Sequence, residues 1–458
     1  MGGDPENTKQ IPPYNTIGDE EKKAVMEVLD SGELSGFVAG PVPAFNGGPR
    51  VKALENAFCE YFGTKHAVSV NSATSGIYCM LMAMGIGPGD EVITSPYTMH
   101  ATASSVLQCG AVPIFADIEE DTYGLDPESV KKNITKNTKG ILAVNIFGHP
   151  ALLNELKEVA EENGLWLLED NAQSPAGIVE GGKYTATVGK AGVFSLNRHK
   201  TIQSGEGGVV ITDDDNIAQK MRLVRNHGET VVEAMGIDDI TNTIGQNLRM
   251  TEMEAAVALC QFHKLDALNT SRIKLAERLT EGLKDIIGIT PPMIRKGSKH
   301  VYYFYVMKYD AKKIGLSRDK FVKAVNAEGY YIRAGYLRPI YLEPMFTKKI
   351  CFGKDGYPFI VNSRNSEIIY ARGLCPVCEK LNDEIVFRDL SEKETDEIEK
   401  LARALDNDNT ENDSGTEGDL SLQGGYESGT EKYQANDLSQ NHKLSLKITL
   451  PEAAITVV

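Results

Sequence analysis

Short apolar segments alternate with helical patterns between residues 66 and 213, and this alternation limits the fold more than any other feature of the chain. Helical patterns fill most of the gaps, notably at 75–84 and 151–163. Strands that alternate with helices predict a largely parallel sheet covered on both faces, and such sheets bind ligands beyond the carboxyl ends of their strands. The predicted strands are 66–70, 91–94, 112–118, 140–146, 165–168, 193–196 and 209–212.

A second, smaller domain is predicted after the break at Pro291-Pro292. We expect an N-terminal segment and large domain at 1–290 and a small α+β domain at 291–405. Residues 406–458 form an acidic tail with few large apolar side chains, which we predict to be disordered. The other elements predicted after residue 250 are a long helix at 251–283, a strand at 301–309 and helices near 318–328 and 392–405.

Composition excludes several classes of function. The 458 residues are 41% hydrophobic and 24% charged, as in ordinary globular proteins. The formal net charge of −16 disfavours nucleic acid as a partner. The first residues lack the basic start and apolar run of a secretory signal, and no apolar stretch approaches the roughly 20 residues that span a bilayer. We therefore expect a cytoplasmic protein without a membrane partner.

The cysteines predict neither a disulfide framework nor a metal site. The 7 cysteines are an odd number and are scattered along the chain. Cys375-Pro-Val-Cys378 is the one C-x-x-C pair, and it has no second pair of Cys or His at ligand spacing. We expect both cysteines to serve in packing.

Lys200 is the first candidate for chemistry, because it lies on the turn between two buried strands. Burial disfavours the charged form of a lysine, and a neutral amine is a nucleophile. On these residues alone, a solvated lysine on a surface turn is the commoner interpretation. Other parts of the sequence have to decide between the two.

Two further patterns favour the nucleophile. Asn71-Ser-Ala-Thr-Ser-Gly76 follows the first strand and opens a helix, where small residues allow either an anion site or an ordinary N-cap. Asp170 ends a buried strand, where a carboxylate needs a helix N-terminus or a cationic ligand atom as its partner. An anion cradle, a strand-end acid and a desolvated lysine are together what pyridoxal 5′-phosphate requires.

At this point the chain resembles a known family, the DegT/DnrJ/EryC1/StrS aminotransferases that act on keto-sugars. The resemblance covers about residues 16–405. It implies an α/β protein of fold type I, with a three-layer αβα large domain around a mostly parallel seven-stranded sheet and a small α+β C-terminal domain. The motifs that carry it are Asn71-Ser-Ala-Thr74, Gly89-Asp-Glu-Val-Ile93, Glu169-Asp-Asn-Ala-Gln173, Phe194-Ser195, Lys200 with Gly205-Glu-Gly-Gly208, Gly245-Gln-Asn-Leu-Arg-Met250 and Cys375-Pro-Val-Cys-Glu379.

The resemblance assigns roles to the candidate residues. It implies that Lys200 is the Schiff-base lysine and that Asp170 keeps the pyridine nitrogen of the cofactor protonated. It places Gln173 near the ring oxygen of the cofactor. The residues that it implies as phosphate contacts within the chain are Ala73, Thr74 and Ser195.

The same resemblance implies a homodimer with shared active sites, because Asn247 and Arg249 fall where the family supplies a phosphate contact from the neighbouring subunit. Met99 stands where many members have an aromatic residue that stacks on the cofactor ring, and His100 is a weaker candidate for that role. Tyr336 and Arg338 are candidate substrate contacts, and a plain structural turn is an equal alternative for that stretch.

The function implied is amino transfer from glutamate or glutamine to a nucleotide-linked keto-sugar or a keto-cyclitol. Some relatives carry histidine in place of the lysine and are sugar dehydratases. The spacing to Gly205-Glu-Gly-Gly208 puts Lys200 rather than His199 at the critical position, which favours transamination. A non-catalytic sensor or scaffold that binds the cofactor stays open as a third alternative.

Overall fold

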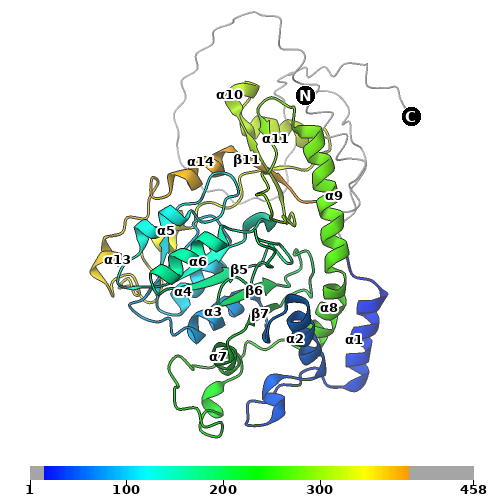
Figure 1. Ribbon diagram of the computed structural model, residues 1–458, viewed down its shortest axis with the longest axis vertical. Coiled ribbons are helices and arrows are strands. Elements are labelled where there is room, and N and C mark those ends of the chain that lie inside the picture. Colours follow the sequence, from blue (N-terminus) through cyan, green and yellow to red (C-terminus); the bar gives the residue numbers. More distant parts are fainter. Residues whose placement is uncertain (1–14, 391–458) are drawn as a thin grey trace, which may run out of the picture.

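The computed structural model describes residues 15–390, and a seven-stranded sheet forms the centre of these residues. The strand order is β1-β7-β6-β5-β4-β2-β3, and β5, β6 and β7 are labelled at the middle of Figure 1. The strands are β1 (His66–Val70), β2 (Glu91–Thr94), β3 (Val112–Phe115), β4 (Thr138–Val144), β5 (Trp166–Asp170), β6 (Ala191–Ser195) and β7 (Gly208–Thr212).

The sheet is mostly parallel, as predicted. The pairs β2–β3, β2–β4, β4–β5 and β5–β6 are parallel, whereas β7 runs antiparallel to both of its neighbours, β6 and β1. Each of the seven predicted segments overlaps a strand, and the bounds differ by up to three residues in either direction, since apolar runs and ladder hydrogen bonds need not end at the same residue. The direction of β7 puts the loop that carries Lys200 directly between two paired strands.

Helices cover both faces of the sheet because side chains on each strand alternate in direction. Val68 and Val70 of β1 pack with α3 (Ala73–Ala83) and α7 (Asp215–Arg225) in one buried cluster. Ala67, which directly precedes Val68, packs on the opposite face with α2 (Pro49–Phe62) and α8 (Glu252–His263). Further along this second face lie α5 (Pro127–Asn133) and α6 (Leu153–Glu162).

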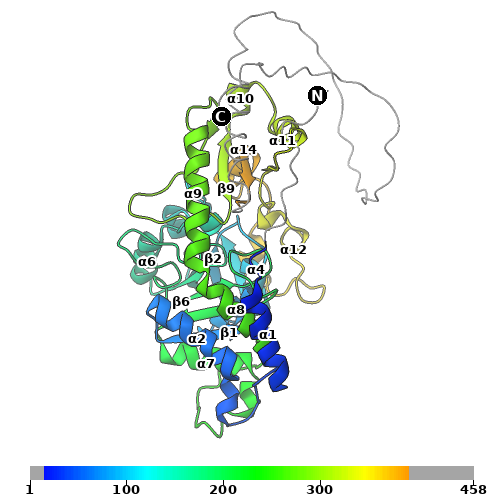
Figure 2. The same cartoon turned by 90° about the vertical axis from the view of Figure 1, so that its right-hand side faces the viewer.

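The long helix predicted at 251–283 is divided in the structure. It ends as α8 at His263 and begins again as α9 (Leu265–Leu283) after Lys264. At the junction the N–H of Lys264 bonds to the carbonyl of Gln261, which is the tighter 3-10 pattern. Figures 1 and 2 both show α9 rising from the level of the large sheet to the small domain.

The small domain is built on a second sheet of order β10-β11-β9-β8 within the described residues. The predicted strand at 301–309 forms only as β9, because Tyr302 has a positive φ of 51° that no β-strand contains. The predicted helix at 318–328 forms as α11 (Arg318–Ala327), whereas the predicted helix at 392–405 and the acidic tail lie outside the described residues. The strands are β8 (Ile289–Thr290), β9 (Tyr305–Tyr309), β10 (Arg333–Ala334) and β11 (Ile385–Arg388).

Of the remaining helices, α4 (Ala101–Gln108) packs beside α3 on the large sheet, and α1 (Asp19–Ser31) lies at the N-terminal side, next to α8 (Figure 2). Among the described residues, no helix is long and apolar enough to cross a membrane. The other helices are α10 (Ala311–Ile314), α11 (Arg318–Ala327), α12 (Pro344–Thr347), α13 (Ser363–Glu367) and α14 (Pro376–Glu384), with short 3-10 turns η1 (Pro43–Asn46), η2 (Ile146–Gly148), η3 (Gly228–Thr230) and η4 (Ile340–Leu342).

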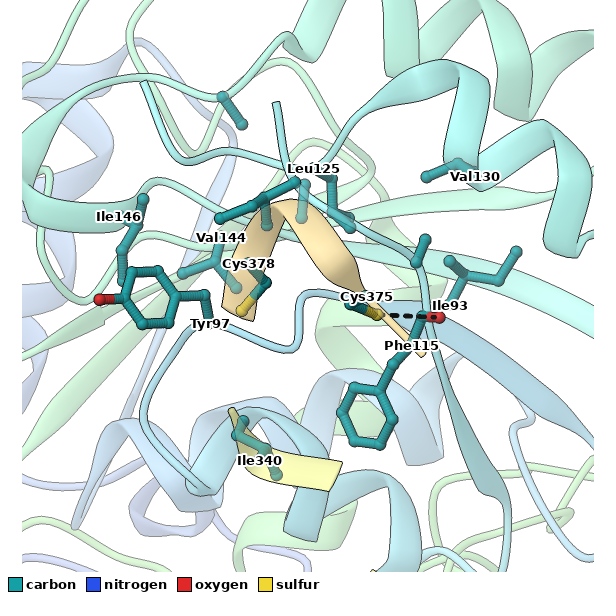
Figure 3. Packing of buried hydrophobic residues seen from close by; sticks show 14 of the residues in the cluster. Ile93, Tyr97, Phe115, Leu125, Val130, Val144, Ile146, Ile340, Cys375 and Cys378 are labelled. Carbon is teal, nitrogen blue, oxygen red and sulfur yellow. Dashed lines mark hydrogen bonds between the residues drawn. The ribbon is translucent and has the colours of Figure 1, made fainter. Parts of the chain in front are cut away.

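The C-x-x-C pair belongs to the hydrophobic core. Figure 3 shows Cys375 and Cys378 at the start of α14, pointing among buried side chains of the large domain. The N–H of Cys378 donates to the carboxylate of Asp117 at 2.9 Å, so the motif starts a helix. Burial raises the pKa of both thiols. The pair thus fastens α14 to the large sheet.

Candidate active site

Lys200 lies on the loop that joins β6 to β7, beyond the carboxyl end of β6. Backbone bonds from Leu196 to Gly207 and from Arg198 to Gly205, both 2.9 Å long, hold the two sides of this loop together. Lys200 is half-buried, and burial lowers its pKa to about 8 despite the opposing charge of Asp170. Roughly one amine in ten is then neutral at pH 7, against about one in a few thousand at the ordinary value.

Asp170 ends β5, next to β6 in the sheet, and its side chain is buried. Its Oδ2 accepts a hydrogen bond of 2.8 Å from Thr102 Oγ1, and its Oδ1 accepts one of 3.1 Å from the N–H of Ala172. Burial raises the pKa of Asp170, while these bonds and the charge of Lys200 oppose the rise. The structure therefore brings the predicted acid and the predicted amine into one electrostatic site.

Thr102 is a site residue that the sequence analysis missed. It lies in the first turn of α4, and its hydroxyl lies 3.2 Å from that of Thr98, so two buried hydroxyls lead to Asp170. Both threonines follow β2, and their separation by one helical turn was the available signal. Their function is to hold the carboxylate in one orientation.

Glu169 and Asp170 are adjacent but have different surroundings. Glu169 points to the opposite face of the sheet, where it accepts backbone bonds from Ala186, Val188 and Gly189 at 2.6 to 2.9 Å. Every oxygen of Glu169 is thereby engaged by protein, so this carboxylate fastens the 186–189 loop. Asp170 instead faces Lys200 and keeps its charge available for a ligand.

Gln173 connects the site to the small domain. Its Oε1 accepts a bond of 2.8 Å from the N–H of Phe147, and its Nε2 donates to the hydroxyl of Tyr336 at 3.1 Å. Burial raises the pKa of Tyr336 to about 12, so the hydroxyl stays neutral and can accept this bond. The structure thus places the predicted substrate contact Tyr336 beside the predicted cofactor contact Gln173.

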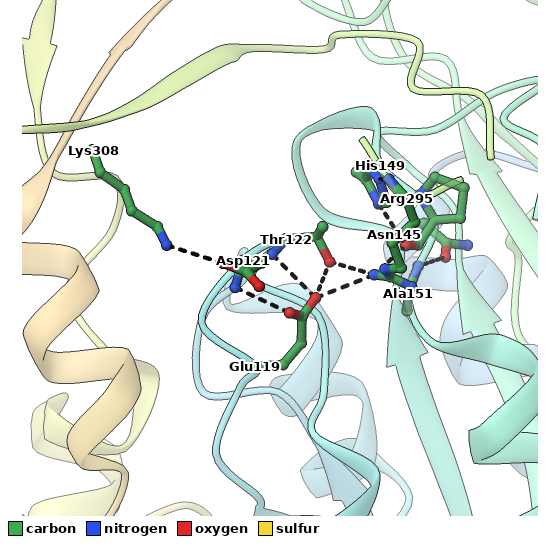
Figure 4. A network of polar contacts seen from close by, with 9 residues as sticks. Glu119, Asp121, Thr122, Asn145, His149, Ala151, Arg295 and Lys308 are labelled. Atoms are coloured by element: carbon green, nitrogen blue, oxygen red, sulfur yellow. Dashed lines mark hydrogen bonds and ion pairs between the residues drawn. The ribbon is translucent and has the colours of Figure 1, made fainter. Parts of the chain in front are cut away.

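A polar network surrounds residues 145–151, the segment whose Phe147 N–H bonds to Gln173 (Figure 4). Arg295, on the segment between β8 and β9, donates to the carboxylate of Glu119 at 3.1 Å and to the carbonyl of Pro150 at 3.0 Å. The N–H of Arg295 also donates to Nε2 of His149, and burial beside Arg295 lowers the pKa of His149 to about 4. His149 is therefore a neutral acceptor that helps to set the backbone near Phe147.

The N-terminus of α3 meets the ends of β6 and β7. Ser195 pairs with Gly208, and a Cβ on Gly208 would lie 2.7 Å from the backbone nitrogen of Ala73. Only glycine permits this approach. Ser72 caps the helix through the N–H of Ser75, while the other first-turn N–H groups have no acceptor inside the helix.

These groups fit pyridoxal phosphate. The α3 N-terminus, with half-buried Ala73 and Thr74 and the nearby Ser195, offers backbone N–H groups and hydroxyls to a phosphate. The hydrogen-bond donors of the buried Asp170 carboxylate, Thr102 and Ala172, are both neutral. The negative charge of Asp170 can therefore pair with a cationic ring nitrogen. Lys200 supplies the amine.

Tyr303 is a second residue that the sequence analysis missed. The Nζ of Lys200 lies 4.6 Å from the centre of the Tyr303 ring, a cation–π contact. Tyr303 is buried, and it lies in the aromatic run that the sequence analysis assigned to a strand. The contact shows that the small domain covers Lys200, which no local pattern could indicate.

The other predicted site residues lie nearer the surface. Met99 is 52% exposed, and its sulfur accepts a bond from the N–H of Ala101, while His100 lies 3.8 Å from Glu343. Arg338 is exposed. The assignment of Met99 as the residue stacked on the ring, and of Arg338 as a substrate contact, therefore stays a prediction.

Asn247 and Arg249 lie on one segment beside the α3 N-terminus, because the N–H of Asn71 donates to the carbonyl of Leu248 at 2.9 Å. Asn247 is exposed, and Arg249 donates to Oδ1 of Asn226 at 2.8 Å. A contact across subunits is a property of an assembly, so this role also stays a prediction.

Comparison with known proteins agrees with this geometry. The sequence model of the DegT/DnrJ/EryC1/StrS aminotransferase family matches residues 15–385. The spore coat polysaccharide biosynthesis protein SpsC of Bacillus subtilis is 32% identical over 358 residues, which cover 76% of this chain and 89% of SpsC.

Solved structures give the same result. The aminotransferase from Psychrobacter cryohalolentis superimposes with a TM-score of 0.75 and 25% identity, over 87% of this chain and 98% of its own. DesI, solved in the presence of its TDP-sugar product, superimposes with a TM-score of 0.71 and 26% identity, over 86% of this chain and 90% of its own. The chain belongs to the DegT/DnrJ/EryC1/StrS family and is a pyridoxal-phosphate-dependent aminotransferase.

Proposed function

We propose that this aminotransferase moves an amino group from glutamate or glutamine to a nucleotide-linked keto-sugar, in the synthesis of an amino sugar. The similarity to SpsC, named for polysaccharide biosynthesis, and to DesI, which has a TDP-sugar product, supports a sugar acceptor. A keto-cyclitol is the second acceptor class, because the family resemblance covers both.

The observation that carries the proposal is that Lys200 and Asp170 follow and end the neighbouring strands β6 and β5, close enough for their charges to interact. The amine, with its pKa lowered to about 8, is neutral often enough to take a proton from a substrate carbon and to return it. When bound, pyridoxal phosphate supplies an electron-withdrawing ring that stabilises negative charge on that carbon. Asp170 serves this chemistry by holding a positive charge at its own end of the site.

Water has to be kept away from such a centre. The ring of Tyr303 covers Lys200, and Tyr336 packs beside it against Tyr97 and Phe147 with ring centres 5.8 and 5.1 Å apart. Aromatic side chains exclude solvent and strengthen the interaction between charges inside the site. The small domain therefore supplies the apolar wall, and the large domain supplies the reactive groups.

Transamination is favoured over dehydration by the contrast between neighbouring residues. Lys200 is half-buried and interacts with Asp170, whereas His199 is exposed to solvent. A dehydratase of this family needs histidine at the position that Lys200 occupies.

The proposal predicts that the cofactor-loaded protein aminates a member of a panel of nucleotide-linked keto-sugars and keto-inositols when glutamate or glutamine is present. Mass spectrometry identifies the amino product, and borohydride reduction followed by peptide mapping should locate the cofactor on Lys200. A cofactor-loaded protein that aminates no member of the panel would favour the sensor or scaffold alternative.

We also propose that the active enzyme is a homodimer, with Asn247 or Arg249 of each subunit serving the site of the other. Analytical ultracentrifugation measures the mass of the particle in solution, which should be twice that of the 50.0 kDa chain. Mixing a Lys200→Ala subunit with an Arg249→Ala subunit should restore activity if Arg249 acts across the interface.

A further inference from the structure

Arg333 is an unusual charged residue at the edge of the small sheet. It lies on β10, where it pairs with Phe387 of β11, so both side chains project from the same face of the sheet. The Phe387 ring lies 4.8 Å from that of Phe304 and 6.2 Å from that of Tyr336, centre to centre. This face of the small sheet is therefore the one that meets the Lys200 site.

The guanidinium of Arg333 is held between two aromatic rings. Its central carbon lies 5.0 Å from the centre of the Tyr331 ring and 5.8 Å from that of Phe387. Its Nε donates to the hydroxyl of Tyr331 at 3.0 Å. Two cation–π contacts and a hydrogen bond restrict the motion of the guanidinium and so remove part of the entropy that a ligand would otherwise have to offset.

The terminal nitrogens of Arg333 are left for another partner. Of the five N–H donors of a guanidinium, the bond to Tyr331 uses one. Across residues 15–390, no carboxylate forms an ion pair with Arg333, although acidic residues are plentiful. A fixed, solvent-accessible guanidinium with both terminal nitrogens open matches an oxyanion in two-point geometry.

Arg333 is also close enough to influence the reactive groups. The Phe387 ring beside Arg333 contacts Phe304, and the Phe304 ring lies 4.3 Å, centre to centre, from that of Tyr303, the residue whose ring covers Lys200. Arg333 thus lies on the small-domain side of the site, and a continuous series of aromatic rings joins it to the amine.

We propose that Arg333 binds an oxyanion of a substrate, either the carboxylate of the amino donor or the diphosphate of the sugar acceptor. This inference rests on the proposed function. It makes Arg333 a specificity-determining residue, and it distinguishes Arg333 from the predicted contact Arg338, which has no such aromatic support in the described residues.

The experiment uses the cofactor-loaded variants Arg333→Gln and Arg333→Lys, with Arg372→Gln as the control. Arg372 is an exposed arginine of the small domain, so its variant loses the same charge away from the site. Calorimetry measures the binding of glutarate, as a probe of the donor carboxylate, and of uridine and thymidine diphosphate, as probes of the acceptor. Rapid kinetics measures the donor and acceptor half-reactions separately.

Arg333→Gln should weaken the binding of at least one probe by about tenfold or more and slow the matching half-reaction. Cofactor affinity and melting temperature should stay unchanged. Arg333→Lys should recover part of the loss, because lysine keeps the positive charge but cannot donate two parallel hydrogen bonds to one oxyanion. Weaker glutarate binding identifies the donor, weaker diphosphate binding identifies the acceptor, and loss of both means that the two oxyanions share Arg333.

The inference is overturned if Arg333→Gln binds every probe as Arg372→Gln does, or if its losses follow a loss of cofactor binding. A wild-type protein that runs neither half-reaction would instead contradict the proposed function itself.

Discussion

Lys200 and the pair Cys375 and Cys378 are all potential nucleophiles withdrawn from water, yet burial affects them in opposite ways. It lowers the pKa of Lys200 to about 8, and it raises the pKa of both thiols. In each case the neutral form is favoured. The neutral form of an amine is its reactive form, whereas the neutral form of a thiol is its unreactive form.

The second difference lies in the surroundings. Lys200 interacts with the charge of Asp170 beyond the carboxyl ends of two neighbouring strands, while the cysteines lie inside the hydrophobic cluster that joins α14 to the large sheet. Desolvation by itself therefore does not make a site. It makes one where it produces the reactive form beside a group that can hold the complementary charge.

The largest expected effect comes from removing the amine. Lys200→Ala should lower kcat by at least about a thousandfold, because no other group can move the proton. Lys190→Ala is the control, since Lys190 is exposed at the opposite end of β6. Steady-state kinetics checks both variants. A Lys200→Ala enzyme with near-normal turnover would show that the buried amine is not the reactive group.

The second largest effect is expected for Asp170→Asn, which should lower kcat by about a hundredfold or more. The amide keeps the shape of the carboxylate but not the charge that interacts with Lys200. Circular dichroism should show an unchanged fold. A variant that keeps its turnover would mean that the complementary charge is not needed.

Glu169→Gln separates stability from catalysis on the same strand. The new amide nitrogen would face backbone N–H donors of the 186–189 loop, so the free energy of unfolding should fall by about 1–3 kcal/mol. Denaturant titration measures this change. The turnover of the folded variant should stay near that of the wild type, and a loss like that of Asp170→Asn would refute the division of roles.

Thr102→Val should have a smaller effect that depends on pH. The hydroxyl of Thr102 favours the ionised form of Asp170, so its loss should raise the pKa of Asp170 further. Activity should therefore be lost first on the acid side, and the acid limb of the kcat/KM profile should move to higher pH while the upper plateau changes little. An acid limb that stays in place, or moves to lower pH, would show that Thr102 does not tune Asp170.

The smallest effect is expected at the cysteines. Iodoacetamide at neutral pH should leave Cys375 and Cys378 of the native protein unmodified, because both are buried with raised thiol pKa values. Mass mapping checks this, with the half-buried Cys260 as an internal reference and the unfolded protein as the positive control. Labelling of either core cysteine as fast as Cys260 would contradict the comparison.

The sequence alone predicted the seven strands of the large sheet, with ends displaced by up to three residues, because each strand carries its own apolar pattern. Asp170 and Lys200 could be found for that reason, since Asp170 ends one such strand and Lys200 lies on the loop that follows another. The antiparallel direction of β7 could not be predicted, because periodicity carries no information about direction.

Other features depend on packing between distant segments. Tyr303 covers Lys200, and Arg333 faces the site, only because the small sheet lies against the large one. The break at Lys264 and the positive φ of Tyr302 are likewise local responses to tertiary contacts, in segments whose own patterns favoured a continuous helix and a longer strand.

The hydrogen bond between Gln173 and Tyr336 links the two domains at the centre of the site. Since it joins a large-domain amide to a small-domain hydroxyl, its free energy contributes both to the order of the amide and to the relative position of the domains. Such coupling is reciprocal. A ligand that binds more tightly when the Gln173 amide is ordered must therefore also favour the approach of the two domains. The free energy by which the ligand favours this approach equals the free energy by which the approach strengthens the binding of the ligand.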